Sequence, residues 1–138
     1  MTCVVDASIA VKWVVPEALS TKADELLARE GELLAPDLLL VEVANVLWKK
    51  TVRRELSPRD ADRAFTLLMK FGIDLRPSAP LLGRAMQLAR LLGHPVYDCV
   101  YLVLAEREDA TLVTADARLL DRVKQRRLRV SVVDVAAL

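Results

Sequence analysis

The chain has 138 residues, of which 54% are hydrophobic and 28% are charged, a composition that excludes a disordered chain. Twenty Lys and Arg residues against 19 Asp and Glu give a net charge of +1, so bulk charge does not indicate a strongly basic nucleic-acid binder. Asp6 and Lys12 interrupt the apolar N-terminus, and no apolar run approaches the ~20 residues that cross a bilayer. We expect one domain over residues 1–138, soluble and cytoplasmic, with no membrane attachment.

The first half of the chain alternates short apolar runs with helical patterns. Residues 3–5 predict a strand buried on both faces, and residues 9–15 predict a short helix that ends before Pro16. A second helix is expected over 19–29, with Gly31 ending it, followed by a weak strand at 33–35. Pro36 and Asp37 open a longer helix to about residue 54, whose first half has almost no polar stripe.

The second half continues the alternation. Ser57 and Pro58 predict the start of a helix to about residue 70, and residues 73–76 predict a short edge strand. Helices are expected over 80–92, 97–107 and 116–124, and strands over 111–113 and 130–133. This order predicts an α/β fold with a small central parallel sheet flanked by helices, and an active cleft at the carboxyl ends of its strands.

Six of the 19 acids have apolar neighbours on both sides, which is unusual for a solvated carboxylate: Asp6, Glu42, Asp74, Asp98, Asp116 and Asp134. Asp74 has the alternation of an outward-facing edge-strand residue, and Asp134 lies near a terminus expected to be mobile. Glu42 is the most conspicuous, because a mid-helix carboxylate in an apolar helix needs a partner. The other three could equally be helix caps.

If Asp6, Glu42, Asp98 and Asp116 meet at one cleft, their mutual repulsion requires a proton or a cation. Carboxylate oxygens without a His or Cys nearby favour Mg²⁺ or Mn²⁺, and phosphoryl chemistry is the natural use of such a site. We interpret the single histidine, His94, as a structural loop residue, and the two cysteines as core.

Four segments in order carry a family resemblance: VVDASIAVKWVVPE, VEVANVLWK, PVYDCVYLVLAE and LVTADARLL. Together they resemble PIN-domain ribonucleases over essentially the whole chain, and VapC toxins of toxin–antitoxin systems in particular. The resemblance implies a three-layer PIN fold and a Mg²⁺- or Mn²⁺-dependent endonuclease for single-stranded RNA that leaves 5′-phosphate and 3′-hydroxyl ends. It also implies a cognate VapB-type antitoxin as a partner.

The family's acidic quartet maps onto Asp6, Glu42, Asp98 and Asp116 as catalytic residues. By this resemblance the metal ligands are Asp6, Asp98 and Asp116, with Glu42 acting on the attacking water or completing a second metal site. The family's supporting polar positions are Ser8 and Thr114, and Asn45 often accompanies the helical Glu. Asp121 has charged and apolar neighbours typical of a solvated helix face, and it is left out of the set.

Two basic clusters could contact RNA phosphates or could simply be solvated helix faces, with the candidate contacts being Lys49, Arg53, Arg118 and Arg122. The apolar helices at 9–15 and 38–48 favour a homodimer or an antitoxin laid across them. Trp13 and Trp48 could each be an anchor at such a surface or an ordinary core residue.

Three other interpretations stay open on the residues alone. The chain could be a PIN nuclease that processes RNA outside a toxin pair, with the same site. It could be a phospho-accepting signalling domain, although that leaves Glu42 unexplained and offers no strand-end lysine. It could also be a metal-free interaction module.

Overall fold

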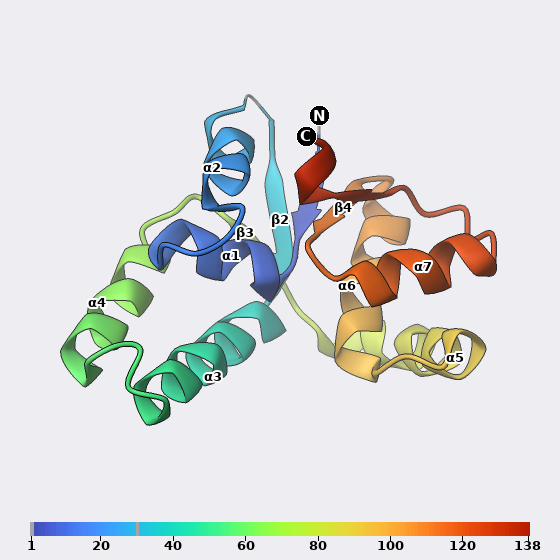
Figure 1. Ribbon diagram of the computed structural model, residues 1–138. Coiled ribbons are helices and arrows are strands. Elements are labelled where there is room, and N and C mark those ends of the chain that lie inside the picture. Colours follow the sequence, from blue (N-terminus) through green and yellow to red (C-terminus); the bar gives the residue numbers. More distant parts are fainter. Residues whose placement is uncertain (1, 30) are drawn as a thin grey trace.

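The computed structural model describes residues 2–29 and 31–138, which form five parallel strands and seven α-helices. The sheet order is β3-β2-β1-β4-β5, and helices flank the sheet in a three-layer arrangement (Figure 1). The α/β prediction is therefore confirmed. The strands are β1 (Cys3–Val5), β2 (Leu33–Pro36), β3 (Asp74–Arg76), β4 (Thr111–Thr114) and β5 (Val132–Asp134).

The helices agree with the predicted pattern to within a few residues at each end. They are α1 (Ala7–Val14), α2 (Ser20–Ala28), α3 (Leu38–Val52), α4 (Pro58–Leu68), α5 (Leu82–Leu92), α6 (Val96–Glu108) and α7 (Ala117–Gln125). The start predicted near Pro80 is a 3₁₀ turn, Ala79–Leu81, that leads into α5. Ser57 caps α4 as predicted, and Gly93 ends α5 in the left-handed conformation that glycine adopts without strain.

Helix α6 is the central helix of the fold. It packs against β1, β2 and β4, and its residues from Cys99 to Ala105 are buried on every side. A helix that is apolar all round belongs inside a protein, and α6 satisfies that rule within one chain. The N-terminal end of α6 therefore lies fixed beside the carboxyl ends of the inner strands.

The helix expected over residues 9–15 needs no partner chain. Ile9, Val11 and Trp13 of α1 are all buried, and the Trp13 indole Nε1 donates a hydrogen bond to the Ala23 carbonyl at 2.7 Å. The prediction of Trp13 as an interface anchor is wrong, because α2 and the edge of Phe71 already cover it. Helix α3 differs, since Val41, Trp48 and Val52 are each more than half exposed.

Two smaller expectations are also tested by the fold. Asp74 is exposed on edge strand β3, as predicted. Asp134 is an ordered part of the fold: it is the last residue of β5, and its carboxylate accepts a hydrogen bond from the Ala136 N–H. Within the described residues, no single helix is long and apolar enough to cross a membrane. The pair Ala79–Leu92 and Val96–Glu108 meets the length and composition criteria together, but it is bent by 114°.

Candidate active site

Asp6 comes directly after β1 and caps α1. Its Oδ1 accepts a hydrogen bond from the Ile9 N–H at 3.2 Å and another from the Ser8 hydroxyl at 2.5 Å. Its Oδ2 accepts one from the Thr114 hydroxyl. Burial raises the pKa of Asp6 to about 6, although these three donors act in the opposite direction. The hydrogen bonds thus hold the carboxyl group rigidly, while burial disfavours its charged form.

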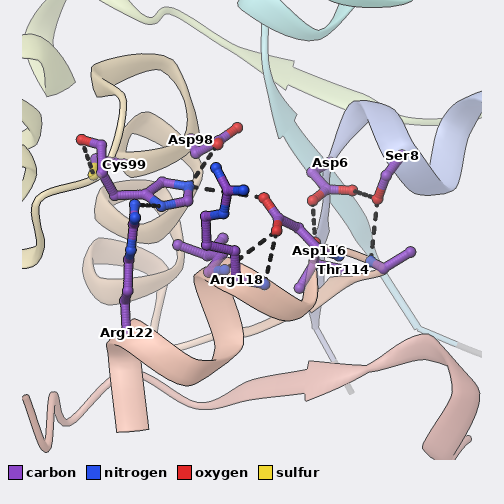
Figure 2. A network of polar contacts seen from close by, with 11 residues as sticks. Asp6, Ser8, Asp98, Cys99, Thr114, Asp116, Arg118 and Arg122 are labelled. Carbon is purple, nitrogen blue, oxygen red and sulfur yellow. Dashed lines mark hydrogen bonds and ion pairs between the residues drawn. The ribbon is translucent and has the colours of Figure 1, made fainter. Parts of the chain in front are cut away.

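Ser8 and Thr114 join the ends of β1 and β4, as Figure 2 shows. Each hydroxyl donates to Asp6 and accepts from the backbone after β4: Ser8 from the Ala115 N–H at 3.1 Å, and Thr114 from the Asp116 N–H at 3.0 Å. With donor and acceptor roles both filled, neither hydroxyl can rotate freely. The two residues fix Asp6 relative to Asp116.

Asp116 follows β4 and caps α7. Its Oδ1 accepts from the Arg118 and Leu119 N–H groups at 3.0 and 3.2 Å, which satisfies two donors of the first turn. Its Oδ2 lies 3.7 Å from Nε2 of His94. The helix-cap interpretation and the site interpretation are therefore compatible, because one oxygen caps and the other faces the cluster.

Glu42 lies in the second turn of α3 and meets its partner on α6. The Tyr101 hydroxyl donates to Glu42 Oε1 at 2.6 Å. Burial raises the pKa of Glu42, as do the charges of Asp98 and Asp6, while the Tyr101 hydrogen bond lowers it. Burial and the same three carboxylates raise the pKa of Tyr101, so its phenol keeps its proton and remains a donor. Glu42 is within electrostatic reach of Asp6 and Asp98.

Asp98 lies in the first turn of α6, and His94 contacts it from the preceding loop. His94 Nε2 is 2.7 Å from Asp98 Oδ2, and His94 Nδ1 is 2.7 Å from Nη1 of Arg122 on α7. The His94 side chain is 2% exposed. His94 lies in the loop between α5 and α6, as expected, but its contacts with Asp98 and Arg122 were not predicted.

The four predicted acids thus lie at the ends of β1 and β4, in the second turn of α3 and in the first turn of α6. One ligand atom each from His94, Asp98 and Asp116 lies within 4.8 Å of the other two. Asp98 raises the pKa of both Asp6 and Glu42 by repulsion. A divalent cation would offset that repulsion, and carboxylate oxygens are the donors that Mg²⁺ and Mn²⁺ prefer, so the residues present fit such an ion.

The remaining predicted residues lie outside this cluster. Asn45 is exposed on α3, and so are Lys49 near its end and Arg53 just beyond it. Arg118 is exposed in the first turn of α7, whereas Arg122 is partly buried and its guanidinium reaches His94. Asp121 is exposed on α7, in agreement with its exclusion.

Sequence reasoning missed His94 and Tyr101, although both gave a signal. His94 lies four residues before Asp98, a spacing that brings side chains together once a helix starts between them. Tyr101 lies in an otherwise apolar run, where a buried phenol needs a hydrogen-bond partner. The expectation that no His lies near the acids was therefore wrong.

Comparisons with known proteins identify the family and the fold. The family model described as PIN domain matches residues 3–125. Ribonuclease VapC3 of Pyrobaculum aerophilum is 36% identical over 124 residues, which are 88% of this chain and 95% of the relative. The crystal structure of PAE2754 from Pyrobaculum aerophilum is 26% identical, with a TM-score of 0.75 over 99% of this chain and 91% of that one. The structure of VapBC2 from Rickettsia felis, bound to a DNA fragment from their promoter, is 15% identical. It has a TM-score of 0.66 and covers 97% of this chain and 98% of the other, so it shows likeness of fold.

Proposed function

The chain belongs to the PIN-domain family, and from that premise we propose that it is a VapC-type endoribonuclease, the toxin of a toxin–antitoxin pair. The observation that supports the proposal is that Asp6, Glu42 and Asp98 act on one another electrostatically, while Asp116 is linked to them through Thr114 and His94. Phosphodiester cleavage is a chemistry that such a group of carboxylates performs with a hard divalent ion.

In this proposal Asp6, Asp98 and Asp116 hold Mg²⁺ or Mn²⁺. The bound ion supplies positive charge that offsets the charge on the scissile phosphate. Ser8 and Thr114 keep Asp6 in place, and Asp116 offers Oδ2 while its other oxygen caps α7. These side chains are held before the substrate arrives, so little reorganisation is needed during the reaction.

Glu42 acts on the attacking water. Tyr101 engages Oε1, so we assign Oε2 to accept the water's proton. The pKa of Glu42 is raised by burial and by the neighbouring acids, which makes its carboxylate a stronger base than a solvated one. In-line attack by this water breaks the P–O3′ bond, and the leaving 3′-oxygen takes a proton from solvent, so the products are a 5′-phosphate and a 3′-hydroxyl.

We assign contacts with the RNA backbone to Lys49, Arg53 and Arg118, which are exposed basic residues of α3, its C-terminal end and α7. Arg122, from the same predicted set, contacts His94 instead. The substrate class is single-stranded RNA, and the proposal includes a cytoplasmic location, where that RNA is found.

The proposed protein partners are a second copy of the chain and a VapB-type antitoxin. The support is the exposed apolar strip of α3, formed by Val41, Trp48 and Val52, together with the groove beside it that Trp48 and Phe65 line between α3 and α4. A structural neighbour of the same fold is a VapBC assembly. Buried apolar area of this kind is what drives association.

Cleavage of an end-labelled single-stranded RNA with Mg²⁺ or Mn²⁺ tests the nuclease proposal. We expect Asp98→Asn to lose cleavage while keeping the wild-type circular dichroism spectrum. Asp121→Asn makes the same change at an exposed acid of α7 and should cut at the wild-type rate. An Asp98→Asn protein that cuts as fast as wild type would refute the assignment.

Growth of cells that express the chain separates a toxin from a processing nuclease. A toxin should arrest growth, and co-expression of the protein encoded by the adjacent small gene should restore it. Normal growth of cells that contain active wild-type nuclease would favour the RNA-processing alternative.

A further inference from the structure

The proposed metal site has a buried histidine at its edge whose two nitrogens face different partners. His94 Nε2 lies 2.7 Å from Asp98 Oδ2 and 3.7 Å from Asp116 Oδ2. His94 Nδ1 lies 2.7 Å from Arg122 Nη1. Figure 2 shows the Arg122 side chain extending from α7 into this network of contacts, apart from Asp98.

These contacts decide where the imidazole proton sits. A guanidinium group has five N–H donors and no acceptor, and it stays charged in proteins. Its hydrogen bond to His94 therefore requires an unprotonated Nδ1 with a free lone pair. The ring proton is then on Nε2, which donates to Asp98 Oδ2.

A histidine in this tautomer cannot bind a metal ion through Nε2. Metal-bound histidines present one nitrogen lone pair to the ion and donate the other N–H to a carboxylate, a carbonyl or water. Here Nε2 faces the acids but carries the proton, and the group at Nδ1 cannot accept one.

We propose that Arg122 determines the metal specificity of this site by keeping His94 out of the ligand set. This inference rests on the proposed function, which places a divalent ion among the acids. With Arg122 present the donors are carboxylate oxygens, which suit Mg²⁺ and Mn²⁺. Without it, Nδ1 can take the proton, and the Nε2 lone pair joins Asp98 and Asp116, whose ligand atoms already lie within 4.8 Å of it. Such a nitrogen-containing set favours Zn²⁺ and Co²⁺.

The tautomer can be read directly, because the chain has a single histidine. Two-bond ¹H–¹⁵N NMR spectra of the metal-free protein, labelled with ¹⁵N-histidine, distinguish a protonated Nε2 from a protonated Nδ1. We expect a protonated Nε2 in wild type. A proton on Nδ1 would overturn the proposal whether or not the site binds metal.

Metal titrations by calorimetry then test the specificity. Arg122→Gln provides a carbonyl oxygen that can accept the Nδ1 proton, and we expect its Zn²⁺ affinity to rise about tenfold or more over wild type. Arg122→Lys only donates, so it should leave Zn²⁺ affinity near the wild-type value. The double variant Arg122→Gln/His94→Gln should lose the gain.

The controls separate failure of this inference from failure of the proposed function. If the nuclease proposal is wrong, wild type will not bind Mn²⁺. The NMR spectra of the metal-free protein still show which nitrogen of His94 carries the proton. If wild type binds Mn²⁺ but Arg122→Gln gains no Zn²⁺ affinity, or gains it without needing His94, the specificity role of Arg122 is refuted. Should Arg122→Gln fail to fold, a protonated Nε2 in both wild type and Arg122→Lys would support the proposal, and a protonated Nδ1 in either would contradict it.

Discussion

The buried carboxylate of Asp6 lowers the stability of the metal-free fold when it is charged. In the metal-free fold its pKa of about 6 exceeds the ordinary 3.8, so the folded chain holds a proton more tightly than the unfolded chain does. Stability therefore falls as pH rises from about 4 to 6, because the charged form is the poorly solvated one. The shift corresponds to a cost of about 3 kcal/mol above pH 6.

Asp6→Asn removes the buried charge but can accept hydrogen bonds at only one of the two oxygen positions, so we expect the variant to be more stable than wild type at pH 7.5 by less than about 3 kcal/mol. Urea unfolding in the presence of EDTA measures the difference. At pH 4 the advantage should largely disappear, since Asp6 is then protonated in the fold. A variant less stable than wild type at pH 7.5 would contradict this account of Asp6.

Tyr101 tunes Glu42 through one hydrogen bond to the charged carboxylate. Because that bond lowers the pKa of Glu42, Tyr101→Phe should raise the pKa and move the acid limb of the pH–rate profile to higher pH. Cleavage should fall on the acid side of the profile, with little change at pH 8.5. Tyr97→Phe is the matched control at an exposed position of the same helix. An unchanged profile in Tyr101→Phe would separate Glu42 from the proton transfer.

Residue patterns predicted one part of this site and missed another. Asp6 and Asp116 could be found because they come just after strands, and parallel strand ends share an edge. Ser8 and Thr114 were assigned from the family resemblance. The contacts of His94 and Tyr101 depend on how α6 is placed against α3 and α7. The local sequence could show that His94 lies near Asp98 and that Tyr101 needs a partner, but it could not show that the partners on the other helices are Arg122 and Glu42.

At the scale of elements, hydrophobic periodicity located the strands and helices because each has a buried face or is buried throughout. Apolar helices were harder to interpret. Both α1 and α3 were expected to need an outside partner, yet α2 and the core cover α1, and only α3 keeps an exposed strip. Composition alone does not say which neighbour covers a helix.

The α3 strip gives a prediction about assembly. Trp48→Ser/Val52→Ser should convert a dimer of the chain into a monomer in sedimentation equilibrium, because the two side chains are 59% and 62% exposed in the single chain. Met86→Ser makes a similar change at an exposed position of α5 and should leave the dimer intact. A wild type that is monomeric at all concentrations would refute the homodimer.

At the scale of the whole molecule, a net charge of +1 means that RNA binding depends on local basic surfaces. In an Asp98→Asn background, which prevents cleavage, Lys49→Gln/Arg53→Gln should weaken RNA binding. It should also flatten the plot of log affinity against log salt by about 1.4. The control Arg59→Gln/Lys70→Gln removes equal charge at exposed positions at the two ends of α4 and should leave that slope unchanged. Equal slopes for wild type and Lys49→Gln/Arg53→Gln would remove these residues from the RNA-binding surface.

The central claim is that four carboxylates from separate parts of the chain form one site that holds a divalent ion. Calorimetric titration of the metal-free full chain with Mn²⁺ tests it most directly. The account predicts saturable binding by wild type and by Asp121→Asn, and loss of that binding in Asp98→Asn. Wild-type Mn²⁺ affinity in Asp98→Asn, or no Mn²⁺ binding by the wild-type chain, would contradict it.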